Sequence, residues 1–232
     1  MEHGIKTKAR FAGLFTLLTI LGGAFAQGYV SESLVDFSDA AATAANILAH
    51  PNLLQLGFTV YMVEMACQIA MTALFYELLK PVNRSVNLVA TFLSLAGCVI
   101  KALSRVFFVA PLLVLRGASY AGVFSAAQLQ ALTLLLLGIN DRGAGMALIF
   151  FGFSTLLKGY LMFLSTFLPR FLGVLGIVSG VGWLTFLYPP LGYRLFPVIA
   201  GFGLLASAVL IFWLLVFGVD EAKWREVAAG NV

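Results

Sequence analysis

Lys80-Pro81-Val82-Asn83-Arg84 is a short polar run between two long apolar stretches, residues 53–79 and 86–115. At about 1.5 Å per residue, each stretch is long enough to cross the roughly 30 Å hydrocarbon core of a bilayer as a helix. Proline and asparagine favour a turn between them. The region therefore predicts an antiparallel pair of membrane-spanning helices, and the rest of the chain extends this pattern.

Residues equally far from this turn in sequence should lie at about the same depth in such a pair. The matched pairs are Tyr61 with Arg105, Glu64 with Lys101, Gln68 with Cys98, and Thr72 with Ser94. On each helix the four residues recur at steps of three or four, so they share one face. We call these eight residues the polar seam, and we expect a Glu64–Lys101 ion pair at its centre.

The composition excludes a soluble globular domain. Hydrophobic residues make up 61% of the 232 residues and charged residues only 10%, against roughly 25% charged in soluble domains. The net charge is +4, but the basic residues lie at loops and helix ends without interleaved aromatics, so nucleic-acid binding has no support. We expect one integral membrane domain over residues 1–232, an all-α, polytopic helical bundle.

Six apolar stretches are long enough to span a bilayer. They lie at about residues 9–29, 53–79, 86–115, 141–167, 171–188 and 196–219. The acidic loop 30–52 is expected at the outer face, with a short alanine-rich helix for which Ser38 is a candidate N-cap. Residues 121–139 are only weakly apolar in their first half, so we predict an interfacial or re-entrant helix before span four.

The distribution of basic residues favours six spans over seven. With six, both termini and the 80–84 turn face the cytoplasm, and eight loop or end cations lie on that side against three outside. A seventh span at 121–139 would move Arg170, Lys223 and Arg225 outside. Ala24-Phe25-Ala26 resembles a signal-peptidase site, so cleavage of the first span is an alternative.

A glycine stripe and a diproline predict how the fifth span packs and where it ends. Gly176 and Gly180, with Gly173 nearly on the same side, allow close helix approach, and we favour packing inside the bundle over a dimer interface. Pro189-Pro190 is expected to close span five.

Two readings of the Glu64–Lys101 pair stay open. It is either a buried ion pair that fixes helix register, or part of a site that holds a polar head group or passes a proton. Arg105 and Lys158 favour the second, because with Lys101 they give three mid-membrane cations to one carboxylate, an excess that invites an anion. The candidate ligand-binding residues are Tyr61, Glu64, Gln68, Lys101, Arg105 and Lys158.

No catalytic, metal or cofactor signature accompanies these residues. Cys67 and Cys98 are predicted to be small packing residues rather than a disulfide, and the two histidines, His3 and His50, lie outside the spans. A nucleophile beside a base, a paired carboxylate site and a phosphate-binding glycine loop are all missing from the sequence. Asn140-Asp141 is predicted to cap span four, with an external ligand contact as the alternative.

Several runs resemble a known family. They include Ala9-Arg10-Phe11-Ala12-Gly13-Leu14, residues 39–50, Tyr76-Glu77-Leu78-Leu79-Lys80-Pro81-Val82-Asn83-Arg84, and Phe167-Leu168-Pro169-Arg170. Together they resemble the bacterial integral membrane family DUF4386, over nearly the whole chain. The resemblance implies a compact multi-helix protein of the bacterial inner membrane and supplies no activity. Glu64 and Lys158 stand where the family pattern tends to be apolar, so the resemblance does not carry the ion pair over as a family property.

Three functional hypotheses follow from the sequence. The leading one is an inner-membrane protein that binds or moves a small amphipathic or anionic ligand at the polar seam: Lys101 and Arg105 attract the anion, Glu64 balances the charge, and Tyr61 and Gln68 orient the ligand. The second is a non-catalytic partner of another membrane protein, docked through loop 30–52 or segment 121–139. A membrane-embedded lipid-modifying enzyme comes last. Membrane lipid is a partner under all three.

Overall fold

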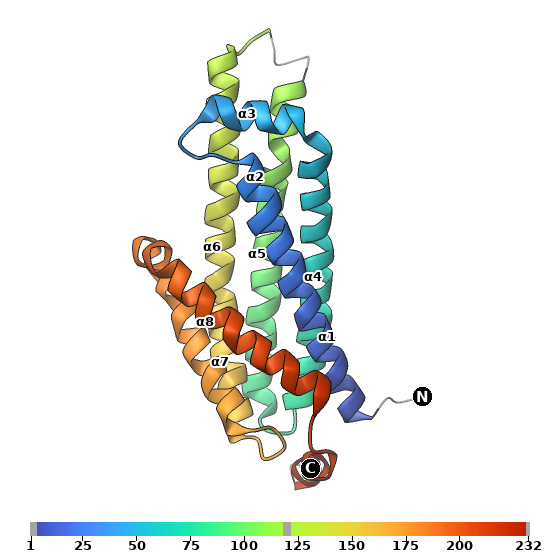
Figure 1. Ribbon diagram of the computed structural model, residues 1–232. Coiled ribbons are helices and arrows are strands. Elements are labelled where there is room, and N and C mark those ends of the chain that lie inside the picture. The colour runs from blue at the N-terminus through green and yellow to red at the C-terminus, as the bar shows by residue number, and fades with distance from the viewer. Residues whose placement is uncertain (1–3, 118–121, 231–232) are drawn as a thin grey trace. The chain divides into compact units, whose positions relative to one another are not determined.

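A computed structural model describes residues 4–117 and 122–230, and every regular element within these ranges is helical (Figure 1). The chain divides into two compact units. The first comprises Met1–Thr19, Ala66–Cys98 and Gly145–Val232, and the second comprises Ile20–Met65 and Val99–Ala144. Several of the long helices contribute residues to both units.

Six helical stretches are long and apolar enough to cross a membrane, which confirms the predicted all-α class and the six spans. The first combines α1 (Ile5–Gly23), a π-helix η1 (Ala24–Ser31) and α2 (Glu32–Leu34). The others are α4 (Pro51–Leu79), α5 (Arg84–Arg116), α6 (Ala126–Leu164), α7 (Arg170–Trp183) with the 3₁₀ turn η2 (Leu184–Leu187), and α8 (Pro189–Val216). Two shorter helices are α3 (Ala40–Ala49) and α9 (Glu221–Gly230).

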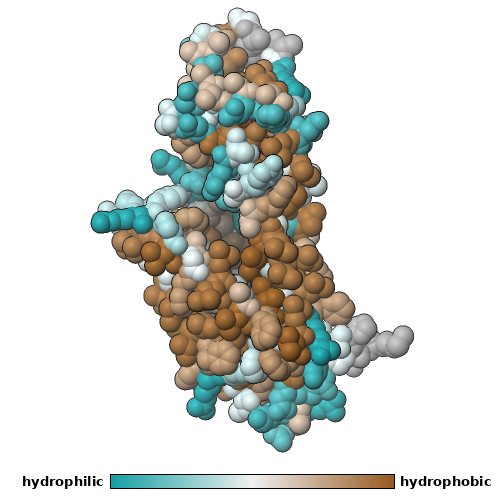
Figure 2. Space-filling model, viewed as in Figure 1, coloured by the Kyte–Doolittle hydropathy of each residue, from teal (hydrophilic) through white to brown (hydrophobic). Residues whose placement is uncertain are grey.

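Large apolar side chains point outward along these helices, as a lipid-facing surface requires. Phe92, Leu103, Leu113, Val198 and Phe212 are each more than half exposed. On the face seen in Figure 2, the side chains over the length of α8 are mainly hydrophobic. The chain is therefore a multi-pass membrane protein.

The first unit packs around a core drawn from α1, α4, α6, α7 and α8, with Leu78, Leu161, Leu172 and Leu214 among its buried residues. Close approach of α6 and α7 depends on glycine. A methyl group at Gly180 would lie 2.5 Å from the backbone N of Leu156, and one at Gly173 would overlap the backbone N of Phe163. The glycine stripe thus lies in an internal packing contact, as the sequence analysis favoured.

The second unit packs around Val30, Ile47, Leu54, Phe108 and Leu137, from η1, α3, α4, α5 and α6. Figure 1 shows α3 running crosswise to α4, which begins directly after it. The predicted short helix in the 30–52 loop is confirmed.

The cap of α3 differs from the prediction. Asp39, and not Ser38, is the N-cap, because its Oδ1 accepts from the backbone N–H of Ala42 at 2.9 Å. Ser38 instead donates its hydroxyl and its backbone N–H to Asp36 Oδ1, at 2.6 and 2.8 Å. These bonds lower the pKa of the Asp36 carboxyl.

The predicted separate helix at 121–139 is wrong for the described residues, because Ala126 onward belongs to α6, a single helix of 39 residues. The polar residues that lowered its hydropathy form a start signal: Ser125 N–H donates to Gln128 Oε1, and Gln128 N–H donates back to Ser125 Oγ. At about 1.5 Å per residue the helix is roughly 58 Å long and exceeds a roughly 30 Å hydrocarbon core.

One further expectation about helix ends is also wrong. Asn140 and Asp141 lie inside α6 and cap nothing, since no helix begins there. Span five ends directly before the diproline, as predicted: η2 ends at Leu187, and Pro189 is the first residue of α8. Proline suits that position because the first N–H groups of a helix have no intrahelical acceptor.

Candidate membrane-embedded ligand site

Glu64 of α4 and Lys101 of α5 are in direct contact in the second unit, as their equal distance from the turn predicted. Lys101 Nζ donates to Glu64 Oε1 at 2.5 Å. The Glu64 side chain is 4% exposed and that of Lys101 is 18% exposed. Pairing is what makes two such charges tolerable in a membrane-spanning segment, since a lone charge there costs at least about 2.5 kcal/mol.

The other carboxylate oxygen, Glu64 Oε2, is buried and has no hydrogen-bond partner. Glycines at the end of α1 leave room for the side chain: a methyl group at Gly23 would lie 3.4 Å from Glu64 Oε1, and one at Gly22 would lie 3.4 Å from Glu64 Cβ. The carboxylate is therefore closely surrounded and only half satisfied.

Arg105 lies one helical turn further along α5 and is 2% exposed. Its guanidinium carbon lies 3.7 Å from the centroid of the Tyr61 ring, a close cation–π contact. Its Nη1 donates to Asn140 Oδ1 of α6 at 2.9 Å, while its Nε is buried without a hydrogen-bond partner. The guanidinium is thus held by an aromatic face and a neutral amide, and its buried Nε–H stays without a hydrogen-bond partner in the described part of the chain.

Tyr61 connects Arg105 to two other helical segments of the second unit. Its ring packs edge-on against Phe108 with 5.4 Å between centroids, and its hydroxyl donates to Gln27 Oε1 at 2.8 Å. Gln27 lies in η1, the π-helical part of the first span. Such segments are rare in proteins and are frequent at functional sites.

Of the two cations at this site, Lys101 makes an ion pair and Arg105 makes none with the described residues. The Lys101 charge is met directly by Glu64. Within the described ranges, Arg105 makes no ion pair, although Glu64 and Asp141 interact with it electrostatically at longer range. Among the described residues of the second unit, Arg105 is therefore the buried cation with capacity for a direct anionic partner.

Two predicted site residues, Gln68 and Lys158, belong to the first unit. The Gln68 carbonyl accepts from Thr72 Oγ1, which also shares a 2.8 Å hydrogen bond with Ser94. Lys158 is buried, with its Nζ 5.8 Å from the centroid of the Phe75 ring. The structure brings Tyr61, Glu64, Lys101 and Arg105 together in one unit.

Sequence reasoning missed Gln27 and Asn140. Asn140 was interpreted as a helix cap, and 35 residues separate it from Arg105, so no spacing rule connects them. Gln27 did carry a signal, as a polar residue inside an apolar span, but the π-helical turn that places it could not be read from periodicity.

Cys67 and Cys98 are both buried and do not form a disulfide, in agreement with the prediction of packing residues rather than a disulfide. Among residues that the structure describes, no group of three or more His, Cys, Asp or Glu side chains could hold a metal ion.

Comparison with known proteins gives one finding. A family model described as "Domain of unknown function (DUF4386)" matches residues 11–218. No curated protein and no solved structure matches the chain.

Proposed function

Because this chain belongs to the DUF4386 family, whose description names no activity, we propose its function from the site itself. The proposal is that this multi-pass membrane protein binds the anionic head group of a small amphipathic molecule at Arg105. The observation that carries it is the buried guanidinium with no ion pair in the described residues and an unpartnered Nε.

The chemistry of arginine supports an anion as the ligand. A guanidinium offers five N–H donors in a planar fork that matches carboxylate and phosphate oxygens. Asn140 takes up Nη1, so the edge that carries Nε is the part left for an oxygen of the ligand. A charge-assisted hydrogen bond at this edge would satisfy a buried donor that otherwise stays unpaired.

Each neighbour has a role in this proposal. Tyr61 and Asn140 hold the guanidinium plane in position, and Glu64 neutralises Lys101 so that the pair does not compete for the ligand. Because Nε is buried, the ligand reaches it only when surrounding side chains move. The π-helical segment that contacts Tyr61 through Gln27 is suited to such movement, since its backbone hydrogen bonding departs from the α-helical pattern.

The proposed location is the bacterial inner membrane with both termini in the cytoplasm. The support is the positive-inside tendency, because Lys6, Lys8 and Arg10 precede the first span and Lys80 and Arg84 lie in the 80–84 turn. Reporter fusions at the turn and at the C-terminus should both report the cytoplasmic side. A periplasmic signal at either position would contradict this orientation.

The test is native mass spectrometry of the protein released from membranes, with identification of bound small molecules. We expect a recurrent anionic amphiphile on the wild type and at least a several-fold loss in Arg105→Gln. Arg105→Lys should retain only part of it, because lysine keeps the charge but lacks the fork.

The matched control is Arg116→Gln, which removes an exposed cation from the end of the same helix. It should retain the ligand fully, and thermal unfolding should show that all variants are folded. Equal amounts of bulk phospholipid on every variant, with no recurrent ligand, would overturn the proposal. That outcome would favour the alternative role as a non-catalytic partner of another membrane protein, in which the closed Glu64–Lys101 pair only fixes helix register.

A further inference from the structure

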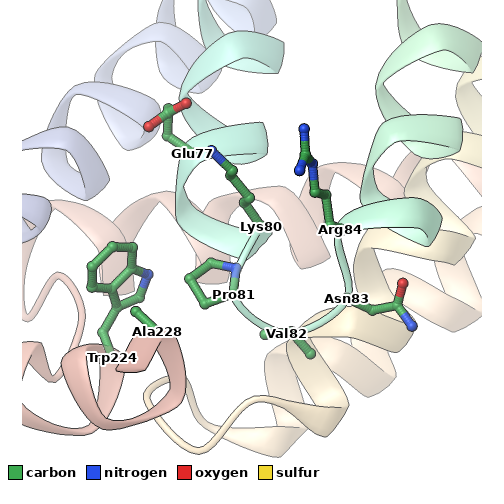
Figure 3. Close-up of a pocket in the computed structure, with 8 residues that line it drawn as sticks. All are labelled: Glu77, Lys80, Pro81, Val82, Asn83, Arg84, Trp224 and Ala228. Atoms are coloured by element: carbon green, nitrogen blue, oxygen red, sulfur yellow. The ribbon is translucent and has the colours of Figure 1, made fainter. Parts of the chain in front are cut away.

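A second basic site lies in the first unit, remote in sequence from Arg105. The turn between α4 and α5 and the C-terminal helix α9 enclose a pocket of about 590 Å³, which we call the turn pocket (Figure 3). Its lining residues are Glu77, Lys80, Pro81, Val82, Asn83, Arg84, Trp224 and Ala228. We propose that the turn pocket binds the phosphate of an anionic phospholipid head group.

The charge of the pocket is the first reason. Lys80 and Arg84 are both exposed, and neither makes an ion pair within the described part of the chain. The lining carboxylate, Glu77, pairs with Lys8 of α1 at 3.6 Å. Two cations therefore face the pocket without a direct counter-charge.

The acidic residues of α9 and its preceding loop do not supply that charge. Glu221 pairs with Arg225 at 3.6 Å, and Asp220 pairs with Lys223 at 3.5 Å. Glu226 is two residues from Trp224 and two from Ala228, so at 100° per residue it lies on the opposite face of α9 from the pocket.

The backbone adds to the attraction for an anion. Arg84 is the first residue of α5, and Asn83 Oδ1 accepts from the backbone N–H of Val86 at 3.0 Å. The first N–H groups of a helix have no intrahelical acceptor, and together they carry a partial positive charge. A phosphate in the pocket would meet this helix end as well as the two side chains.

The direction of the two cations fits a membrane-bound phosphate. In Figure 3 the side chains of Lys80 and Arg84 both point away from the tip of the turn, back along α4 and α5. They reach from the loop toward the ends of the membrane-spanning helices, the level at which the phosphates of the lipid head groups lie in a bilayer.

The opposite wall of the pocket favours a lipid over free phosphate. Trp224 and Ala228 of α9 lie beside Pro81, and Trp224 Nε1 donates to the Leu78 carbonyl at 2.9 Å, which fastens α9 to the end of α4. A tryptophan ring prefers the membrane interface, where one side is apolar and the other polar. This wall suits the glycerol and first methylene groups of a lipid, which inorganic phosphate lacks.

The experiment uses the full-length protein equilibrated in nanodiscs of equal parts phosphatidylglycerol and phosphatidylcholine, followed by native mass spectrometry of the retained lipids. The wild type should retain phosphatidylglycerol several-fold over phosphatidylcholine. Lys80→Gln/Arg84→Gln should lose this preference, because it removes both unpaired cations of the turn pocket.

The control, Arg142→Gln/Arg194→Gln, removes the same charge from exposed residues elsewhere. It should keep the preference, because neither Arg142 nor Arg194 lines the turn pocket. If both double variants lost the preference for phosphatidylglycerol equally, the proposal would be overturned, since the net charge of the protein would then explain the retention. Loss of bound phosphatidylglycerol on addition of millimolar inorganic phosphate would identify free phosphate as the ligand and overturn the lipid assignment.

Discussion

The helices α4 and α5 are joined by neutral groups nearer their turn and by charged groups farther from it. In the first unit, Thr72 shares a hydrogen bond with Ser94, and Asn87 Nδ2 donates to the Tyr76 carbonyl at 2.7 Å. In the second unit, Glu64 meets Lys101 and Arg105 stacks on Tyr61. Near the turn, small neutral side chains thus make the polar contacts between the two helices.

This difference bears on function. Charged side chains inside a membrane are expensive, and those that occur there are usually functional. In its first-unit part the same helix pair makes its polar contacts with neutral groups. The charges of the second unit therefore call for a role beyond packing.

The largest expected effect comes from breaking the charged contact. Lys101→Met leaves Glu64 buried without its partner, and loss of one member of a buried pair typically costs about 3–5 kcal/mol. Unfolding in mild detergent with increasing denaturant would measure the loss. Glu64→Gln/Lys101→Met should recover most of it, because no uncompensated charge remains. A double variant as unstable as the single one would contradict this account.

A smaller effect is expected from the helix contact that holds the first unit. Gly180→Ala places a methyl group 2.5 Å from the Leu156 backbone, and overpacking of this kind costs about 1–3 kcal/mol. The same unfolding assay would measure it. The control is Gly201→Ala in α8, where nothing lies within 4 Å of the added methyl group. If both variants lose the same stability, close approach of α6 and α7 is not what the glycine provides.

The smallest effect is expected at the neutral contact of α4 and α5. A double-mutant cycle with Thr72→Val and Ser94→Ala should give a coupling energy of about 0.6 kcal/mol, the average for hydrogen bonds between membrane helices. It should be well below the coupling from the Glu64 and Lys101 cycle. If the Thr72–Ser94 and Glu64–Lys101 pairs gave equal coupling energies, the neutral and charged parts of the α4–α5 contact would not differ in strength.

Much of the fold could be predicted from sequence because membrane spans depend on local composition. The 80–84 turn, the six spans and the α3 helix follow from runs of apolar residues and from turn residues. The start of α6 could not be predicted in this way. Ser125 and Gln128 lower the hydropathy of the segment, and only the structure shows that they bond to each other's backbone.

The site could be predicted only where two residues share one hairpin. Equal distance from the turn placed Glu64 opposite Lys101 and Tyr61 near Arg105, since an antiparallel pair relates depth to sequence position. Asn140 and Gln27 come from helices with no such relation to the turn, so nothing in the sequence fixes their depth or rotation relative to Arg105.

The π-helical segment Ala24–Ser31 has a consequence for how the chain tolerates changes in length. Each of its turns closes through an i→i+5 hydrogen bond, one residue more than in an α-helix. Loss of a residue elsewhere in a span would rotate every later side chain by about 100° and disrupt the helix contacts. Here the surplus residue could be deleted with the helix still fully hydrogen-bonded, while Gln27 would turn away from Tyr61. This stretch is where a length change would preserve the backbone hydrogen bonds of the span while moving Gln27 and the buried side chains beside it.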